Sequence, residues 1–176
     1  MISRSAAFPA FAPLFPVLAI LLFLCGGCGY RIGMLGHPQL KTIAVAPVTN
    51  ETTAYNAAAQ ARSILCEVFM TDGTLKLTHL STADCILYAK VKSLSFSEVT
   101  WSRDSHDFVP NQWSVKITMD YSVILPGQAK PITAGTASGS AQFMTGPDME
   151  IGRINGIRQA LLAASKNIVV AVTENW

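Results

Sequence analysis

The segment WSVKITMDYSVIL, residues 113–125, alternates between apolar side chains and mostly polar ones. Successive side chains of a β-strand point to opposite faces of the sheet, so this alternation is typical of a strand with one buried and one solvated face. The residues expected on the buried face are Trp113, Val115, Ile117, Met119, Tyr121, Val123 and Leu125. The chain must therefore build a sheet that has one polar face, and other apolar elements must cover the opposite face.

Two segments with helical periodicity can supply that cover. The first runs from Ala54 to Asp72-Gly73, where glycine suits the positive φ of a helix C-terminus, and Thr52 or Thr53 is a suitable N-cap. The second begins after Pro147-Asp148. The expected buried stripes are Ala54, Ala57, Ala58, Ala61, Ile64, Leu65, Val68 and Phe69 in the first helix, and Ile151, Ile154, Ile157, Leu161, Ser165, Ile168 and Val172 in the second.

Four other segments read as strands. Residues 41–48 form an apolar run typical of a strand buried on both faces, residues 75–80 and 85–96 alternate, and residues 132–145 suggest an outer strand weakened by glycine. Residues 100–112 are expected to form a polar, aromatic loop. The order β-α-β-β-β-β-α predicts a two-layer α/β (α+β) sandwich, with two helices on one face of a mostly antiparallel four- to five-stranded sheet.

The N-terminal segment is interpreted as a processing signal. Arg4 precedes an uncharged stretch that ends in the apolar run VLAILLFL, residues 17–24. Eight helical residues span only about 12 Å, far less than a bilayer core of about 30 Å, so the run fits a secretory signal. The small residues Gly26 and Gly27 then precede Cys28, as in the lipobox of bacterial lipoproteins. An uncleaved anchor, or a zinc or redox site of Cys25 and Cys28, is the alternative.

This interpretation divides the chain into three parts. Residues 1–27 are a cleaved lipoprotein signal peptide, residues 28–40 are a lipidated tether, and residues 41–176 are a single periplasmic domain. Gly29 follows the cysteine, and an Asp there tends to retain lipoproteins at the inner membrane of enteric bacteria. We therefore expect an outer-membrane location with the domain in the periplasm, and no cofactor besides the covalent lipid on Cys28.

Several motifs resemble the LPS-assembly lipoprotein family LptE. They are GCGYR at 27–31, TIAVAPVTNET at 42–52, FMTDGTLKLT at 69–78 and ADCILYAKV at 83–91, in this order. The later half agrees with the family only in its pattern of elements. The resemblance implies a protein that lies within the LptD β-barrel of the outer membrane and helps move lipopolysaccharide to the cell surface. Tyr88-Ala89-Lys90, Cys66 and Cys85 depart from the family pattern.

Three lysines are candidates for contact with lipopolysaccharide. Lys90, Lys92 and Lys116 lie on the expected polar faces of two neighbouring strands, where charge-assisted hydrogen bonds to phosphate could form. An ordinary solvated sheet face is the alternative. Trp101, Phe108 and Trp113 give the intervening hairpin an aromatic character, which suits contact with a barrel wall or closure of the core edge.

Other chemistry has weak support in the sequence. The net charge of +2 is too small to indicate nucleic-acid binding. Ser105-His106-Asp107 are neighbours in one segment, whereas the members of a catalytic triad converge from distant positions, so a non-enzymatic protein is expected. His37 and His79 lack partners at metal-ligand spacing. An envelope lipoprotein of the CsgG or LpoB kind, acting in a secretion pore or as an activator of a cell-wall synthase, is the alternative function.

Cys66 and Cys85 could form a disulfide in the oxidising periplasm. Cys66 lies off the buried stripe of its helix, whereas Cys85 points with the core residues of its strand. Two separate, partly buried thiols are therefore expected, with the disulfide as the alternative.

Mass spectrometry of the protein from its membrane is expected to show a chain that begins at an acylated Cys28. Radiolabelled palmitate is also expected to become attached to the polypeptide, because the interpretation requires fatty acyl chains on Cys28. An intact, unacylated N-terminus would contradict the lipoprotein interpretation.

Overall fold

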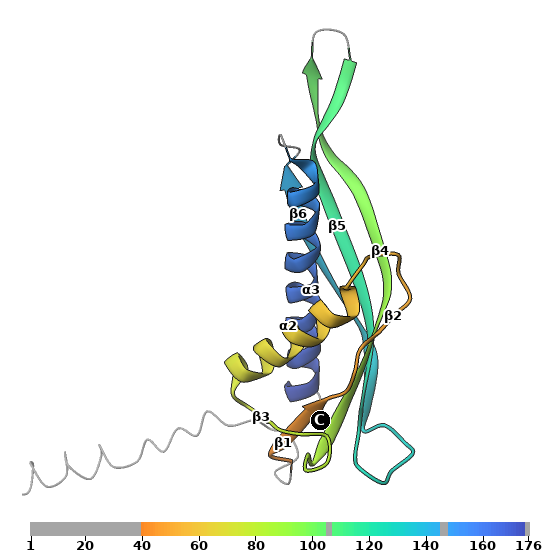
Figure 1. The fold of residues 1–176 in the computed structure, drawn as a ribbon, viewed down its shortest axis with the longest axis vertical. Helices are drawn as coiled ribbons and strands as arrows, with labels where there is room; N and C mark the ends of the chain where they lie inside the picture. The colour runs from red at the N-terminus through yellow and green to blue at the C-terminus, as the bar shows by residue number, and fades with distance from the viewer. Residues whose placement is uncertain (1–39, 105–106, 145–147, 175–176) are drawn as a thin grey trace, which may run out of the picture. The chain divides into compact units, whose positions relative to one another are not determined.

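The computed structural model describes residues 40–104, 107–144 and 148–174 (Figure 1). Of residues 100–104 and 107–111 it describes the backbone alone. Within the described ranges no helix has the length and apolar character needed to cross a membrane. The signal peptide, Cys28 and the tether as far as residue 39 lie outside the described residues, so the interpretation of the N-terminal segment stays a prediction.

The sheet has six strands and a mixed direction. They are β1 (Thr42–Val45), β2 (Thr49–Asn50), β3 (Lys76–Leu77), β4 (Cys85–Asp104), β5 (Asp107–Ile124) and β6 (Thr133–Met144). The order is β3-β1-β4-β5-β6, and β2 pairs with β4 beside β1. Strands β4, β5 and β6 pair antiparallel, whereas β1 runs parallel to β3 and β4, and β2 runs parallel to β4.

The fold class is confirmed, with a sheet that is more mixed than expected. The connection from β1 to β3 passes through a helix, and such a crossover joins parallel strands. The run expected as one strand at 41–48 forms a strand only as β1, since β2 begins at Thr49 after the end of the run, and the strand expected at 75–80 is reduced to β3. The element order is therefore β-β-α-β-β-β-β-α.

Two helices lie on one face of this sheet (Figure 1). Helix α2 (Ala57–Asp72) ends as expected at Gly73, whose φ is 69° and whose N–H donates to the carbonyl of Phe69 over 3.1 Å. The N-cap is Asn56 rather than Thr52 or Thr53. The prediction was wrong because the amide and hydroxyl of Thr52 both donate to Asn50 Oδ1, at 2.9 and 2.7 Å, and this turn delays the helix.

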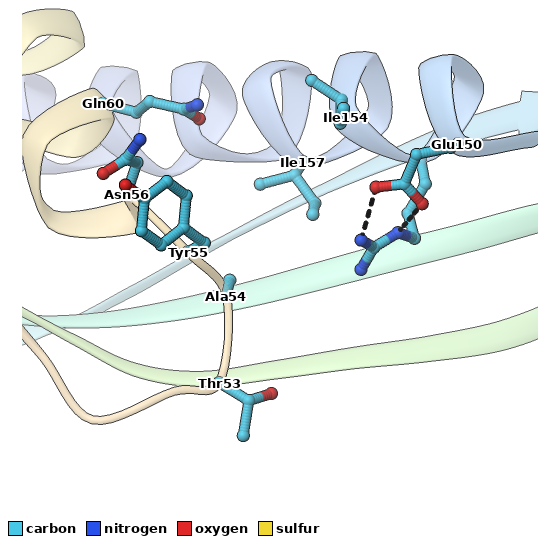
Figure 2. Close-up of a pocket in the computed structure, with 9 residues that line it drawn as sticks. Thr53, Ala54, Tyr55, Asn56, Gln60, Glu150, Ile154 and Ile157 are labelled. Carbon is cyan, nitrogen blue, oxygen red and sulfur yellow. Dashed lines mark hydrogen bonds and ion pairs between the residues drawn. The ribbon is translucent and has the colours of Figure 1, made fainter.

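Helix α3 (Met149–Glu174) packs along β5 and β6, and its buried stripe is confirmed from Ile157 to Val172. Ile151 and Ile154 are 57% and 47% exposed, contrary to the prediction. In the first turns of α3, Gly156 faces the sheet. A Cβ atom added to this glycine would lie 2.7 Å from the ring of Phe143. Because Phe143 already fills that space, the two isoleucines remain on the flanks of the helix, and Figure 2 shows Ile154 beside a groove.

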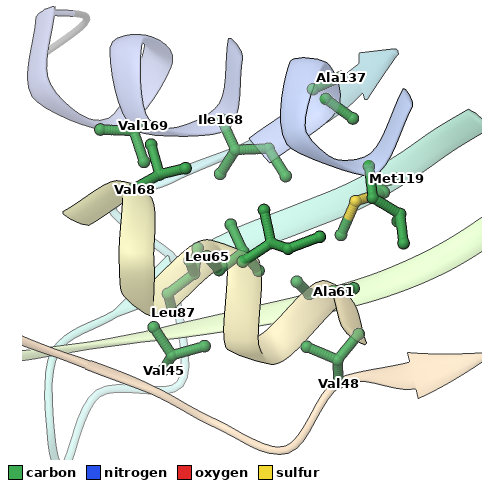
Figure 3. Packing of buried hydrophobic residues seen from close by; sticks show 14 of the residues in the cluster. Val45, Val48, Ala61, Leu65, Val68, Leu87, Met119, Ala137, Ile168 and Val169 are labelled. Carbon is green, nitrogen blue, oxygen red and sulfur yellow. The ribbon is translucent and has the colours of Figure 1, made fainter. Parts of the chain in front are cut away.

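The core lies between the helices and the sheet. Figure 3 shows Leu65 of α2 close to Leu87 of β4, with Ile168 and Val169 of α3 above them. The inward set of β5 follows the expected alternation, with Val115, Ile117, Met119 and Val123 buried, and with Trp113, Tyr121 and Leu125 partly buried against the same cluster.

Strands β4 and β5 continue beyond the rest of the sheet. β6 pairs with β5 from Gln112 to Val123, whereas β4 and β5 pair with one another as far as Asp104 and Asp107. The segment expected to be a loop is therefore a two-stranded ribbon (Figure 1). Register shifts on both sides of Thr100 break the alternation in this segment, so its strand character was not visible in the sequence pattern.

A close contact between α3 and β6 explains the small residues of β6. A Cβ at Gly139 would overlap the carbonyl oxygen of Ala160 and the backbone nitrogen of Ala164 in α3. Gly139 therefore lets the helix backbone approach the strand directly. Asn167, one turn further along α3, donates from Nδ2 to the carbonyl of Ser138 at 2.8 Å and fixes the helix along the same strand.

Replacing Gly139 by alanine is expected to lower the free energy of unfolding by about 1–3 kcal/mol, because the added methyl group forces α3 away from β6. Ser140→Ala is the matched control, since Ser140 is exposed on the adjacent position of the same strand and should change stability by less than about 0.5 kcal/mol. Equal effects of the two substitutions in denaturant unfolding would contradict this packing argument.

Candidate functional site

The structure places Lys90, Lys92 and Lys116 on the face of the sheet that the helices leave uncovered. Lys90 and Lys92 belong to β4, and Lys116 belongs to the neighbouring β5. In the register, Lys90 pairs with Asp120, and Lys116 lies between Ser95 of β4 and Ser140 of β6. The expected placement on two adjacent strands is therefore confirmed.

Two of the three lysines have carboxylate partners. Lys90 Nζ lies 3.0 Å from Glu51 Oε1, and Lys92 Nζ lies 3.1 Å from Asp120 Oδ2. In the described ranges, Lys116 forms no ion pair. Within this set of five side chains, the positive charge that remains uncompensated is therefore that of Lys116, and the expected three-lysine cluster is reduced to one free cation.

Hydrogen bonds hold the acidic partner in its charged form. Thr136 Oγ1 donates to Asp120 Oδ1 at 2.7 Å, and this bond and the one from Lys92 lower the pKa of Asp120. The bond to Glu51 raises the pKa of Lys90, so this lysine remains charged over a wider range of pH.

Hydroxyl groups dominate the rest of this surface. The register places residues side by side in rows across β4, β5 and β6: Ser97, Ser114 and Gln142; Ser95, Lys116 and Ser140; Ser93, Thr118 and Ser138. We call these nine residues the hydroxyl face. Seven of its members carry a hydroxyl group, and Lys116 lies in its central row. The sequence alternation indicated a polar face but not which side chains of separate strands share a row.

A shallow cavity of about 310 Å³ adjoins the hydroxyl face near the paired lysines. Tyr88, which is 45% exposed, contributes an aromatic ring to it. The other lining residues are Pro47, Thr49, Ala89, Lys90, Asp120, Tyr121 and Ser122. In the sequence, Tyr88 stands out only as a departure from the LptE family pattern.

A second cavity of about 370 Å³ opens on the helix side of the sheet (Figure 2). It lies between the turn before α2, with the exposed ring of Tyr55, and the first turns of α3, with Ile154. Arg153 and Glu150 form a two-pronged ion pair at its border, with distances of 2.6 and 2.9 Å. We call this cavity the helix-side groove. It could not be predicted from the sequence pattern, because its two walls are almost 100 positions apart.

The two cysteines of the domain are separate thiols, as expected. Burial raises the pKa of the Cys85 thiol to about 11, with a smaller contribution from the nearby Asp84 carboxylate. Burial also raises the pKa of the half-buried Cys66. A higher pKa leaves less thiolate at neutral pH, so neither group resembles an activated nucleophile.

Other candidates from the sequence have varied outcomes. His79 is exposed, as expected, whereas Cys28, His37, Ser105 and His106 lie outside the described residues. For Trp101, Phe108 and Asp107 the structure describes the backbone. The described ranges contain no group of three or more side chains able to hold a metal ion.

Comparisons with known proteins establish the fold. A scan against protein-family models gave no match, and neither did a comparison with curated proteins. The hypothetical protein CT253 from Chlamydia trachomatis is similar in structure, with a TM-score of 0.54, 14% identity, and 76% of this chain and 96% of that chain covered.

Two other solved structures are similar to this chain. A minor lipoprotein from Acinetobacter baumannii has a TM-score of 0.50, with 11% identity and 77% of this chain and 94% of that chain covered. A PelC dodecamer from Paraburkholderia phytofirmans also has a TM-score of 0.50, with 11% identity and 80% of this chain and 95% of that chain covered. The domain therefore has a fold that also occurs in a bacterial lipoprotein.

Asp120→Asn is expected to lower the free energy of unfolding at neutral pH by about 0.2–1 kcal/mol, the range of exposed ion pairs. Because the folded pKa of Asp120 lies below the ordinary value of 3.8, its contribution is complete above that value and is lost as the pH falls through the folded pKa. The unfolding free energies of the two proteins should therefore converge in acid.

Thr136→Val provides a second check in the same acid-unfolding experiment. It removes the largest cause of the lowered Asp120 pKa, so the contribution of Asp120 should be lost at a higher pH than in the unsubstituted protein. A constant difference between Asp120→Asn and the unsubstituted protein at every pH would contradict this account.

Proposed function

We propose that this chain is a non-enzymatic lipoprotein of the bacterial cell envelope that assists lipopolysaccharide transport together with an LptD-type β-barrel. The lipid on Cys28 would hold it to the periplasmic side of the outer membrane. The motifs at residues 27–91 support this proposal, and so does the occurrence of the same fold in a bacterial lipoprotein.

The hydroxyl face is the observation that carries the proposal. It is broad and polar, and it lies on one side of a sheet whose other side is held by two helices. The lumen of an outer-membrane barrel is also polar, so a sheet face rich in hydroxyl groups can form hydrogen bonds with such a wall. Two helices pack on the other side of the sheet, an arrangement that suits a steric plug.

Lys116 gives the same face a place for an anionic glycolipid. Its ammonium group can donate to a phosphate, and the neighbouring Ser95 and Ser140 can donate hydrogen bonds to phosphate or sugar oxygens. Lys90 and Lys92 would contribute less, because Glu51 and Asp120 already pair with them.

Co-purification from detergent-solubilised outer membrane tests the proposal as a whole. The full-length protein, produced in its source bacterium with a C-terminal tag, should elute with a large β-barrel in a stable complex. The Cys28→Ala protein should be lost from the membrane fraction. Elution of the membrane-bound protein without any barrel would refute the proposed partnership.

Lys116→Ala is expected to weaken binding of purified lipopolysaccharide about two- to fivefold, the effect of one exposed charge pair. Lys130→Ala is the matched control, because Lys130 is also exposed but lies in the turn between β5 and β6, and it should leave the affinity unchanged. Equal affinities of all three proteins, measured at one ionic strength, would show that Lys116 does not contact the glycolipid.

A second candidate function follows from the similarity to a protein described as a dodecamer. A lipoprotein of the CsgG or LpoB kind would act in a secretion pore or on a cell-wall synthase. Light scattering of the detergent-solubilised protein separates the two candidate functions. A large symmetric ring favours the CsgG or LpoB kind, and a monomer bound to one barrel favours the role in lipopolysaccharide transport.

A further inference from the structure

Exposed apolar side chains gather at one end of the domain. They belong to the turn before α2, the last described part of β4, the end of β6 and the first turns of α3: Tyr55, Phe96, Val99, Met144, Met149, Ile151 and Ile154. These seven residues are called the open end. They include most of the large apolar residues that are exposed in the described part of the chain, so their clustering is not a general property of the surface.

Phe96, Tyr55 and Ile154 of the open end lie close to the first turns of α3 or belong to them. The ring of Phe96 packs edge-on against that of Phe143, with centroids 6.4 Å apart. Phe143 in turn lies against Gly156 of α3, and Ile154, two positions before Gly156, lines the helix-side groove opposite Tyr55 (Figure 2). Phe96, Tyr55 and Ile154 therefore lie on the helix side of the sheet, whereas Met144 follows the inward Phe143 on β6 and points to the opposite face.

Strand β4 has a free edge beside this surface. β1 and β2 pair with β4 at residues 85–87 and 90–91, and the amide of Glu51 donates to the carbonyl of Val91 at 2.9 Å. Beyond this bond the chain turns towards α2. Over residues 93–99 β4 has a partner on the β5 side, and no described strand pairs with its other side.

The register determines which backbone groups lie on the free edge. In an antiparallel pair, alternate residues direct both N–H and C=O away from the partner strand. The carbonyl of Val91 points away from β5. After the bulge at Val91/Ser93, the residues whose N–H and C=O groups point away from β5 are Leu94, Phe96 and Glu98. Side chains directly opposite these residues on an added strand would point to the helix side and reach the open end.

The charges around this surface are predominantly acidic. Glu98, Asp148 and Glu150 are the carboxylates, and Arg153 is the one guanidinium among the described residues of this end; its charge is already paired with Glu150. Asp148 also accepts the amide of Ile151 at the start of α3, over 3.1 Å. An acidic border disfavours an anionic membrane surface and a second copy of the same border, and it favours a basic partner.

We propose that the free edge of β4 receives an extended strand of a partner protein, with apolar side chains at alternate positions and basic residues at its ends. The backbone of Leu94, Phe96 and Glu98 forms the hydrogen bonds, and the open end receives the apolar side chains. This is strand addition to a sheet edge, in which the main chain provides affinity and alternate side chains provide specificity. It does not depend on the partner's being a transport barrel.

The test uses the full-length protein in detergent and three fluorescent peptides. The probe is KVTVTVK, with a basic residue at each end. EVTVTVE reverses the terminal charge, and a third peptide carries an N-methyl group on the central valine of KVTVTVK. Fluorescence anisotropy should show saturable binding of the first peptide and about tenfold weaker binding of the other two.

Two pairs of protein variants locate the site. Glu98→Pro removes an edge-facing N–H without breaking a bond to β5, and should weaken binding about tenfold, whereas Glu98→Gln, which removes only the charge, should weaken it two- to threefold. Ile154→Ser should weaken binding about tenfold. Val170→Ser is its matched control, because both residues lie on α3 and both are 47% exposed.

Hydrogen exchange supplies the independent measurement. With KVTVTVK bound, the amides of Leu94, Phe96 and Glu98 should exchange more slowly, and those of β6 should not change. Absence of binding, equal binding of the N-methylated peptide, or protection elsewhere would overturn the proposal. So would a dimer in light scattering that Ile154→Ser dissociates, because the surface would then be a contact between two copies.

Discussion

The backbone of α3 rests directly on β6 at Gly139, and most of the architecture follows from this contact. Since the glycine has no side chain, the helix approaches so closely that Ala160 and Ala164 are fully buried and Asn167 can bond to the adjacent Ser138. This fixes α3 along β6 and β5. The remaining space on that face is taken by α2, which closes the core over β1 and β4.

Covering a single face gives the two sides of the sheet different chemistry. The opposite side keeps the polar half of each alternating strand, and so the hydroxyl face lies in one surface across β4, β5 and β6. Charge on that side is mostly balanced locally, because Glu51 and Asp120 neutralise Lys90 and Lys92. A surface of this kind is suited to recognition by hydrogen bonds, with Lys116 as its point of positive charge.

The open end results from the unequal lengths of the helices and strands. α3 has 26 residues and α2 has 16, and β4 continues beyond its last pairing with β2. The helix layer is therefore incomplete at one end, where apolar side chains and a strand edge are both exposed. In a domain of this size, stability is a small difference between large terms, so an exposed apolar end is more readily explained by binding than by folding.

The sequence alone determined the features that depend on local periodicity: the inward set of β5, the stripe of α2 from Ala57 to Phe69, the helix end at Gly73 and the two-layer class. These were predictable because each residue's side of a strand or helix depends on its near neighbours. Only the tertiary structure decided that Lys90 and Lys92 are paired, that Ile154 is exposed and that β4 has a free edge. The pairing of a charge, the burial of a side chain and the pairing of a strand edge all depend on which distant segments of the chain meet. The sequence pattern does not contain this information, because it reports only on neighbours along the chain.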